Sequence, residues 1–199
     1  MEFSLPRTKK AREKFDRIIQ AADNHIFLYG FEKASIANIT ASAEVATGTF
    51  YLYFKDKLEL YHYLLDNYQT RIKEYIKMRS TGCKTRYEKE RMGLIAWLEF
   101  INDNPHAYSI IWQSLAINKD LFVDYYQKFT SSYKKGLDKD SDQLIELDTL
   151  DLSLMLMGIS SFIGLKGMIH NATNLTNEEI EKTADSIMHA LNGGIFKKD

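Results

Sequence analysis

The stretch SIANITASAEVATGTFYLYFKDKLEL, residues 35–60, decides the fold expected of this chain. Ser35 is a preferred N-cap residue, and a short helix is predicted after it over residues 36–42. A tight break follows, and a second short helix is predicted over about residues 46–52. A longer helix over about residues 9–29 precedes both, with apolar residues three and four apart on one face. The three segments together form a helix-turn-helix pattern.

The second half of this stretch has a regular rhythm of residue types. It reads Gly-x-x-Tyr-x-x-Phe-x-x-Lys-x-x-Leu, at Gly48, Tyr51, Phe54, Lys57 and Leu60. A Gly-aromatic pair stands ahead of it at residues 30–31. In these features, from about residue 9 to 62, the chain resembles the TetR family of bacterial repressors. The remainder resembles that family only in the number and length of its helices.

The resemblance implies an all-α fold with two domains. An N-terminal three-helix helix-turn-helix domain, residues 1–55, would bind DNA. A C-terminal helical bundle, residues 56–199, would bind a ligand and dimerise. The residues agree with this, because helical periodicity continues along the chain to give about nine helices, and alternating strand patterns are not found.

Seven residues of the motif are predicted to contact DNA. A glycine inside a short helix costs about 1 kcal/mol relative to alanine, and close approach to DNA would explain Gly48. The hydroxyls of Thr47 and Thr49 can reach phosphates or base edges. Lys57 lies in the first turn of the next helix, where the helix dipole disfavours a cation and a bound phosphate would reverse that penalty. The predicted DNA-binding residues are Ser35, Thr47, Gly48, Thr49, Tyr51, Tyr53 and Lys57.

Structural roles are the alternative at several positions of the motif. Ser35 is first of all a helix cap, while Phe50 and Phe54 are expected in the core. Two residues depart from the family's pattern. Glu44 stands where the turn often has glycine, so that a non-glycine residue there would adopt a positive φ. Ala46 stands where a serine often caps the second short helix, and that cap or phosphate contact is not expected here.

The charge distribution agrees with a DNA-reading N-terminal part. The whole chain is balanced at −1, with 26 Lys and Arg against 27 Asp and Glu. Residues 1–57 hold nine Lys or Arg and seven Asp or Glu, a net +2, and the remainder carries −3. The basic residues gather between Arg7 and Arg17, where they can track phosphates or form a solvated helix face. Binding is therefore expected to rest on a few placed contacts and a dimer.

Composition excludes several other classes of protein. The single cysteine, Cys83, rules out an intramolecular disulfide and a cysteine-cluster zinc site. The longest uncharged apolar stretch, residues 152–165, is too short to span a bilayer, and no signal peptide is seen, so a cytoplasmic protein without a membrane partner is expected. The five histidines lack metal-ligand spacing and no glycine loop cradles phosphate. Neither catalysis, a metal site nor a cofactor is predicted.

Two long helices near the end are predicted to form a homodimer. Asp148 caps the first, which is apolar nearly all round to about His170 and therefore needs burial on more than one side. A capping box at Thr176 opens the second, and Gly193-Gly194 stop it. In the resembled family these two helices form a four-helix dimer interface. The predicted interface residues are Leu154, Gly158, Ser161, Leu165, Ala184, Ile187 and Leu191.

Large aromatic residues gather in the middle of the chain. The resemblance implies an inducer pocket within the bundle, and ligand sites are usually apolar with a few polar groups. For each of these residues plain core packing is the alternative. A hydrophobic effector, aromatic or acyl, is expected. The predicted ligand-binding residues are Trp97, Phe100, Tyr108, Trp112, Tyr126, Phe129 and Phe162.

The predicted function is that of a ligand-responsive DNA-binding transcriptional regulator. The resemblance implies a repressor whose dimer binds two half-sites of a double-stranded operator and is released by a small hydrophobic molecule. The effector would shift the long helix between Asp56 and Ser80 and move the two recognition helices apart. The alternative from another class is an all-α ligand-binding or enzymatic bundle with a vestigial helix-turn-helix. An architectural DNA binder without a ligand is a lesser one.

Overall fold

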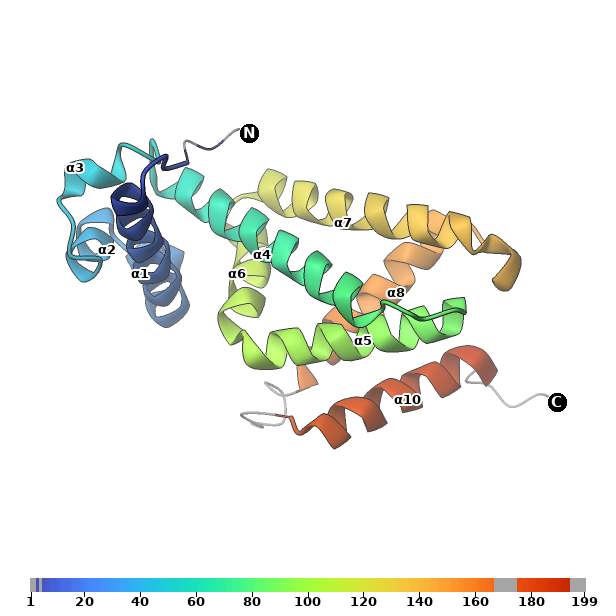
Figure 1. Cartoon of the computed structure of the whole chain (residues 1–199). Helices are drawn as coiled ribbons and strands as arrows, with labels where there is room; N and C mark the ends of the chain where they lie inside the picture. Colours follow the sequence, from blue (N-terminus) through green and yellow to red (C-terminus); the bar gives the residue numbers. More distant parts are fainter. Residues whose placement is uncertain (1–2, 4, 167–174, 194–199) are drawn as a thin grey trace. The chain divides into compact units, whose positions relative to one another are not determined.

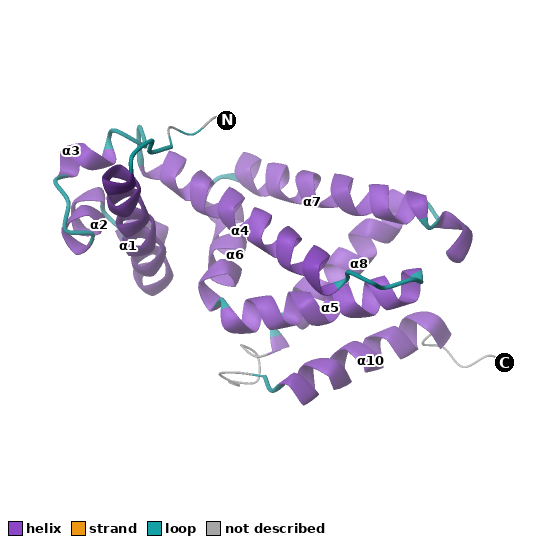
Figure 2. Cartoon of the chain, in the orientation of Figure 1, coloured by secondary structure: helices purple, strands orange, loops and turns teal. Residues whose placement is uncertain are grey.

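The computed structural model of the chain describes residues 3, 5–166 and 175–193. These residues form helices and loops without a strand (Figure 2), so the all-α prediction is confirmed. The predicted number of about nine α-helices also holds within the described residues. Their bounds, with the labels of Figure 1, are α1 (Lys9–Lys33), α2 (Ile36–Ser42), α3 (Thr47–Phe50), α4 (Lys57–Arg79), α5 (Arg86–Asp103), α6 (Pro105–Ile117), α7 (Lys119–Lys139), the 3-10 helix η1 (Ser141–Gln143), α8 (Thr149–Ile163) and α10 (Asn177–Gly193).

The chain divides into two compact units. The first unit contains Met1–Gln69 and Pro105–Tyr125, and the second contains Thr70–Asn104 and Tyr126–Asp199. Helices α4 and α7 each contribute residues to both units. This division follows contacts rather than function, and the predicted boundary between residues 55 and 56 stays a prediction.

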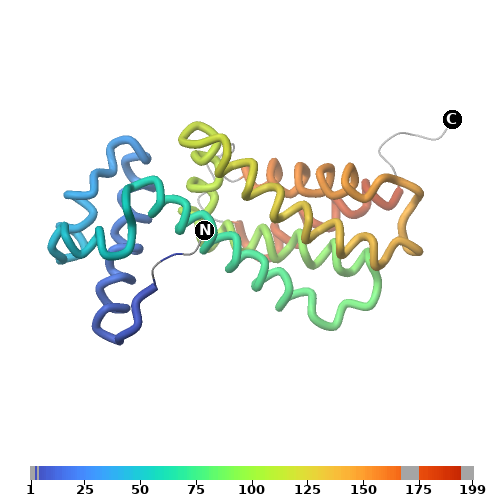
Figure 3. Tube along the Cα trace, turned by 90° about the horizontal axis from the view of Figure 1, so that it is seen from above, coloured from blue at the N-terminus to red at the C-terminus, as the bar shows by residue number. Residues whose placement is uncertain are grey.

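Aromatic side chains hold α1, α3 and the segment before α4 together in the first unit, where Figure 3 shows the blue and cyan helices grouped. The ring of Phe15 stacks on that of Phe54 with 5.6 Å between centroids, and it meets Tyr53 edge-on at 5.1 Å. Phe50 is the buried residue of α3 and lies 5.7 Å from Phe54. Each buried phenylalanine contributes roughly 1.5–3 kcal/mol of apolar burial. Helix α3 is thus anchored through one large side chain.

The end of α1 differs from its prediction. Gly30 has a φ of 79° and interrupts the helix, as the predicted stop requires, because this left-handed conformation suits glycine. The chain then turns helical again as far as Lys33, and the amide of Phe31 donates to Oε1 of Gln113 on α6 at 3.3 Å. Tyr61 on α4 also reaches α6, where its hydroxyl donates to the carbonyl of Ile110 at 2.5 Å. Burial raises the pKa of Tyr61.

The second unit is built on the packing of α10 along α5. The buried face of α10 carries Ile180, Ala184 and Met188, which repeat every four residues. At the edge of the same helix Asp185 pairs with Nε of Arg91 on α5 at 2.5 Å. The apolar face of α10 is therefore used within its own chain, and only the remaining residues of this helix are available to a partner.

A smaller apolar cluster joins α7 and α8, which lie side by side in Figures 1 and 3. Leu137, Leu152 and Leu156 form its centre, with Tyr133 and Leu144 packed against it. Next to it a buried ionic group ties the start of α5 to the end of α7. Its members are Arg86, Glu90, Tyr133, Lys89 and Asp140. Burial is the main cause of the raised pKa of Tyr133. The hydrogen bond from Lys89 lowers the pKa of Asp140.

The predicted caps of the later helices are confirmed. The carboxylate of Asp148 accepts from two amides of α8, and Thr176 and Glu179 exchange hydrogen bonds at the start of α10. The capping box that Thr85 and Glu88 form on α5 was not predicted. Helix α8 ends at Ile163, earlier than expected, and His170 and Gly194 lie outside the described residues. Among the described residues, no helix is both long enough and apolar enough to cross a bilayer.

Candidate nucleic-acid interface and ligand pocket

The outer side of α3 is open to solvent. Thr47 and Gly48 are exposed, and Tyr51 and Leu52 after the helix keep 55% and 67% of their surface. A Cβ added to Gly48 would meet no other atom within 4 Å. Nothing within the chain therefore requires a glycine at this position. A short helix with an exposed face, whose backbone no side chain covers at Gly48, is suited to entering a groove of another molecule.

The turn before α3 has the backbone conformation that was predicted from Glu44 and Ala46. Glu44 takes the positive φ expected of it, at 52°, and its carboxylate lies 3.5 Å from the guanidinium of Arg17. Ala46 precedes α3 without a side-chain cap, as its residue type requires. The hydroxyls of Thr40 and Thr47 lie 3.3 Å apart, which links α2 to α3. Helix α3 thus has a defined orientation despite its length of 4 residues.

Besides Thr47, three of the predicted DNA-binding residues have hydrogen-bond partners within the chain. Lys57 donates from Nζ to the carbonyls of Phe31 at 2.5 Å and Glu32 at 3.2 Å, and it lies 4.3 Å from the centre of the Phe31 ring. The hydroxyl of Tyr53 donates to the carbonyl of Ala11 at 3.2 Å. Ser35 accepts from the amide of Asn38 as the cap of α2. Direct DNA contact by these three residues stays a prediction.

The position of Lys57 has a structural explanation that the sequence pattern does not contain. The pattern places a cation in the first turn of α4, where the helix dipole disfavours it. The amine instead reaches the last carbonyls of α1, where the dipole favours a positive charge. A bound phosphate is therefore not needed to account for this lysine.

Two exposed residues near α3 were not predicted as contacts. Leu52 presents an apolar side chain to solvent, and Lys55 is exposed in the loop before α4. Their signal in the sequence is weak, because they stand between the positions of the three-residue rhythm. Exposure in the folded chain is what distinguishes them.

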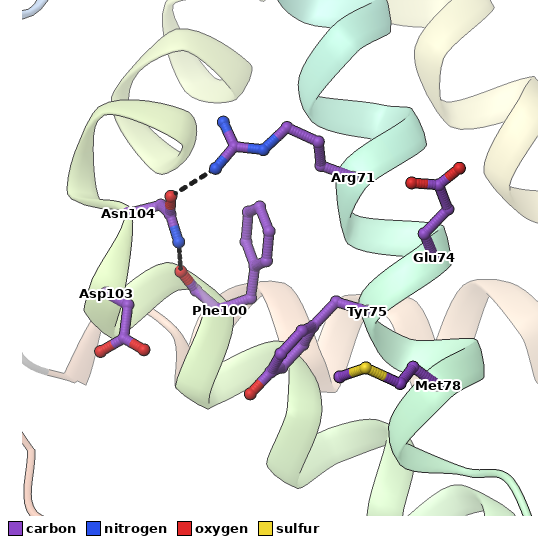
Figure 4. Close-up of a pocket in the computed structure, with 7 residues that line it drawn as sticks. All are labelled: Arg71, Glu74, Tyr75, Met78, Phe100, Asp103 and Asn104. Atoms are coloured by element: carbon purple, nitrogen blue, oxygen red, sulfur yellow. Dashed lines mark hydrogen bonds between the residues drawn. The ribbon is translucent and has the colours of Figure 1, made fainter.

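The second unit contains a pocket of about 490 Å³ between α4 and α5 (Figure 4). The guanidinium of Arg71 lies 5.5 Å from the centre of the Phe100 ring and donates to Oδ1 of Asn104 at 2.8 Å. The ring of Tyr75 lies 5.9 Å from that of Phe100. The pocket thus combines aromatic surface with a cation and carboxylates. It is lined by Arg71, Glu74, Tyr75, Met78, Phe100, Asp103 and Asn104.

The predicted ligand-binding residues do not form one group. Phe100 is the predicted residue that lines this pocket. Trp97 is buried, and its Nε1 donates to the carbonyl of Ser160 at 2.9 Å. Tyr108 and Trp112 belong to the first unit, where their rings lie 6.1 Å apart.

The other three predicted ligand-binding residues lie in the second unit. Tyr126 is half-buried, and this burial raises its pKa. Its hydroxyl forms a hydrogen bond with the side chain of Ser161. The amine of Lys73 lies 4.9 Å from the centre of the Phe129 ring. Phe162 is 67% exposed. The remaining pocket residues were not predicted. Arg71, Glu74, Asp103 and Asn104 are polar, and Tyr75 and Met78 lie on α4, before the aromatic-rich middle of the chain.

The predicted dimer residues on α8 include a set of exposed apolar groups. Leu154 is 51% exposed, and a Cβ on Gly158 would meet no atom within 4 Å. Ser161 and Leu165 are half-buried. Leu150, Met155 and Phe162, which were not predicted as interface residues, are also exposed. This side of α8 therefore offers apolar surface and room for another helix.

On α10 the predicted dimer residues differ in accessibility. Ile187 is half-buried and Leu191 is 38% exposed. Ala184 is fully buried within its own unit. Its small side chain belongs to the face of α10 that packs on α5. The spacing of apolar residues along α10 does not show which helix that face contacts. A place for Ala184 in a dimer interface stays a prediction that this burial does not favour.

Sequence comparisons connect the first part of the chain with bacterial regulators. Residues 18–64 match the family of bacterial regulatory proteins described as the tetR family. An uncharacterised HTH-type transcriptional regulator of Bacillus subtilis is 40% identical over 74 residues, which cover 37% of this chain and 38% of that protein. The fatty acid metabolism regulator protein of the same organism is 33% identical over 110 residues, 53% of this chain and 54% of that protein. The chain thus spans about half or less of the length of these two relatives.

A solved structure shows the same fold along almost the whole chain. The transcriptional regulator FadR of Bacillus subtilis, in complex with stearoyl-CoA, superposes with a TM-score of 0.73 at 18% identity. The match covers 92% of this chain and 100% of that one. Two of these three relatives are named as transcriptional regulators, and the third is named as a regulator of fatty acid metabolism.

Proposed function

We propose that the chain is a ligand-responsive transcriptional repressor of the tetR family of bacterial regulatory proteins, because the model of that family matches residues 18–64. In this proposal it binds operator DNA as a homodimer through α3 and is released by a small hydrophobic molecule. It acts by binding alone, without catalysis. It works in the cytoplasm, because that is where a bacterial operator lies.

The observation that carries the proposal is the open face of α3. Gly48 has free space around it, Thr47 and Tyr51 near it are exposed, and Thr49 is half-buried. Hydroxyl groups of these types bind phosphates and base edges, and a glycine allows the backbone to come close to them. The buried Phe50 orients this face from behind.

Selection of bound sequences from a random pool of double-stranded DNA tests the first part of the proposal. We expect the full chain to select a two-fold symmetric site with half-sites about one helical turn apart. The affinity should fall steeply as salt rises, because phosphate contacts release counterions. A chain that shows no salt-dependent DNA binding would be the ligand-binding or enzymatic bundle instead.

A dimer is proposed because one short helix reads few base pairs. The exposed apolar side chains of α8 support an interface there, since exposed leucine and phenylalanine side chains gain free energy when a second copy covers them. Two copies related by a two-fold axis then present two α3 helices to the operator.

The effector we propose is an acyl-CoA. FadR of Bacillus subtilis is solved with stearoyl-CoA, and the fatty acid metabolism regulator protein is one of the sequence relatives. The pocket of the second unit has a volume typical of small-molecule sites and presents Arg71 beside aromatic surface. The guanidinium suits a phosphate of coenzyme A, and the rings suit apolar groups. Preference of the ligand for a conformation that cannot bind the operator would release the DNA.

Release of the operator tests the effector directly. We expect acyl-CoA thioesters to dissociate the protein from the selected operator, while free coenzyme A does not. Arg71→Ala should raise the concentration of acyl-CoA needed for release. Lys77→Ala is the matched control, because Lys77 is an exposed cation of the same helix that does not line the pocket. Release at the same concentration from both variants would place the effector elsewhere.

A further inference from the structure

A histidine and two aspartates come together in the first unit. His62 and Asp66 lie one turn apart on α4, and Asp124 comes from the first turns of α7. One possible ligand atom of each residue lies within 4.8 Å of those of the other two. All three residues are half-buried. The spacing of four residues puts His62 and Asp66 on one face of the helix.

The imidazole of His62 has an unsatisfied nitrogen. Its Nε2 is buried and makes no hydrogen bond, although it lies 3.4 Å from Oδ2 of Asp66. The side chain as a whole keeps 12% of its surface. A buried polar atom without a hydrogen bond costs about 1–3 kcal/mol, and a ligand that satisfies this nitrogen would remove that cost.

The geometry fits a bound transition-metal ion. Ligand atoms about 2.05 Å from a tetrahedral zinc ion lie about 3.3 Å from each other, close to the observed separation of Nε2 and Oδ2. Since the three ligand atoms lie within 4.8 Å of one another, Asp124 has to approach by up to about 1.5 Å to complete three bonds. An imidazole with two carboxylates suits Zn²⁺ better than Mg²⁺ or Ca²⁺, which prefer oxygen ligands alone.

The surroundings hold this group in place. One turn beyond Asp66, Gln69 donates from Nε2 to the carbonyl of Tyr125 at 2.7 Å, and both residues are buried. This bond fixes α4 against α7 directly beside Asp124. The ring of Phe3 meets the imidazole edge-on at 5.6 Å and covers it from another side. The protein therefore supplies a half-enclosed site from two helices that already contact each other.

We propose that His62, Asp66 and Asp124 bind one divalent transition-metal ion, with Zn²⁺ the best match, and leave a coordination position for water. The bound ion joins the helix that follows the helix-turn-helix motif to α7 within the first unit. The sequence led to no prediction of a metal site, because its five histidines lack the spacing of the metal-binding motifs that contain two histidines. The sequence does contain the spacing His-x-x-x-Asp at His62 and Asp66, which places two ligands on adjacent turns of one helix.

Equilibrium dialysis of the full chain against Zn²⁺, with any affinity tag removed, tests the site. We expect about one ion per chain in the wild-type protein. Asp124→Asn keeps the shape of the side chain but removes its charge, and it should weaken zinc binding at least tenfold, as loss of a ligand exceeds the 10–100-fold effect of outer residues. Zinc should also raise the melting temperature of the wild-type chain and not that of the variant.

Asp120→Asn is the matched control, because it removes the same charge from an exposed position one turn earlier in α7. It should bind zinc like the wild type. His62→Gln should lose zinc binding, whereas His189→Gln, at an exposed histidine of α10, should not. Circular dichroism of each variant checks that it folds.

Absence of zinc binding by the wild type, or equal binding by folded Asp124→Asn and wild type, would overturn the proposal. The measurement involves neither DNA nor an acyl-CoA. Its result is therefore separate from the proposed function as a repressor.

Discussion

At the scale of single residues, Gly48 and Lys57 differ in whether contacts within the folded chain explain their residue type. Both residues belong to the three-residue rhythm of the motif. Gly48 has open space around it, so the chain itself gives no reason for a glycine. Lys57 has two carbonyl partners and an aromatic ring beneath its amine, so the chain itself explains the lysine. The first residue is a candidate for DNA contact and the second has a structural role in addition.

Gly48→Ala should separate stability from DNA binding. The added methyl group meets nothing in the folded chain, and alanine favours a helix over glycine, so the free energy of unfolding should rise by about 0.5–1 kcal/mol. Affinity for the selected operator should fall, because the methyl group keeps the backbone from the DNA. Chemical denaturation and a binding titration measure the two effects. Unchanged affinity would remove Gly48 from the interface.

Lys57→Ala should reduce stability as well as DNA binding. Loss of a charged donor to two carbonyls at a half-buried position should lower the free energy of unfolding by about 1–2 kcal/mol. If the amine also contacts a phosphate, as predicted, the slope of log affinity against log salt should fall by about one. An unaltered slope in the folded variant would leave Lys57 with the structural role alone.

At the scale of elements, the helix ends follow from local sequence. Asp148 and Thr176 each cap a helix with the bonds that their sequence context predicts. These bonds span two or three residues, so a single sequence contains both partners. The length of α3 is a different case, because Tyr51 and Leu52 continue the helical pattern but lie in a turn. The packing of Phe50 and Phe54 decides that end.

Asp148→Ala should weaken the start of α8. Its carboxylate accepts from the amides of Leu150 at 2.8 Å and Asp151 at 3.1 Å, and loss of an N-cap of this kind costs about 1 kcal/mol. Asp142→Ala, in η1, removes an equal charge without removing a helix cap and should leave stability within about 0.5 kcal/mol of the wild type. Urea denaturation compares the two. Equal midpoints would show that the cap contributes little.

At the scale of the whole molecule, the proposal of a dimer concerns the exposed face of α8. Leu154 and Phe162 keep more than half of their surface in the single chain. Ala184, which shares the predicted interface, is buried against its own unit. The proposed interface therefore rests mainly on α8, with the end of α10 beside it.

Leu154→Glu should convert the proposed dimer to a monomer. A carboxylate on an apolar interface loses its hydration when a second copy covers it, which costs several kcal/mol. Sedimentation velocity should show half the mass, and operator affinity should fall because only one half-site is read. Ile145→Glu, at a loop residue that is 77% exposed, is the control and should remain a dimer. A dimeric Leu154→Glu protein would place the interface on another surface.

The sequence by itself determined the helices, most of their caps and the helix-turn-helix motif, because these depend on residues that are close along the chain. The positive φ of Glu44 and the missing cap at Ala46 were also predictable from residue type. Only the tertiary structure decided which sides of these helices stay open. The partners of Lys57, the burial of Ala184 and the meeting of His62 with Asp124 depend on segments far apart in sequence. Such contacts are set by packing, and a periodic pattern contains no information about which distant segment covers it.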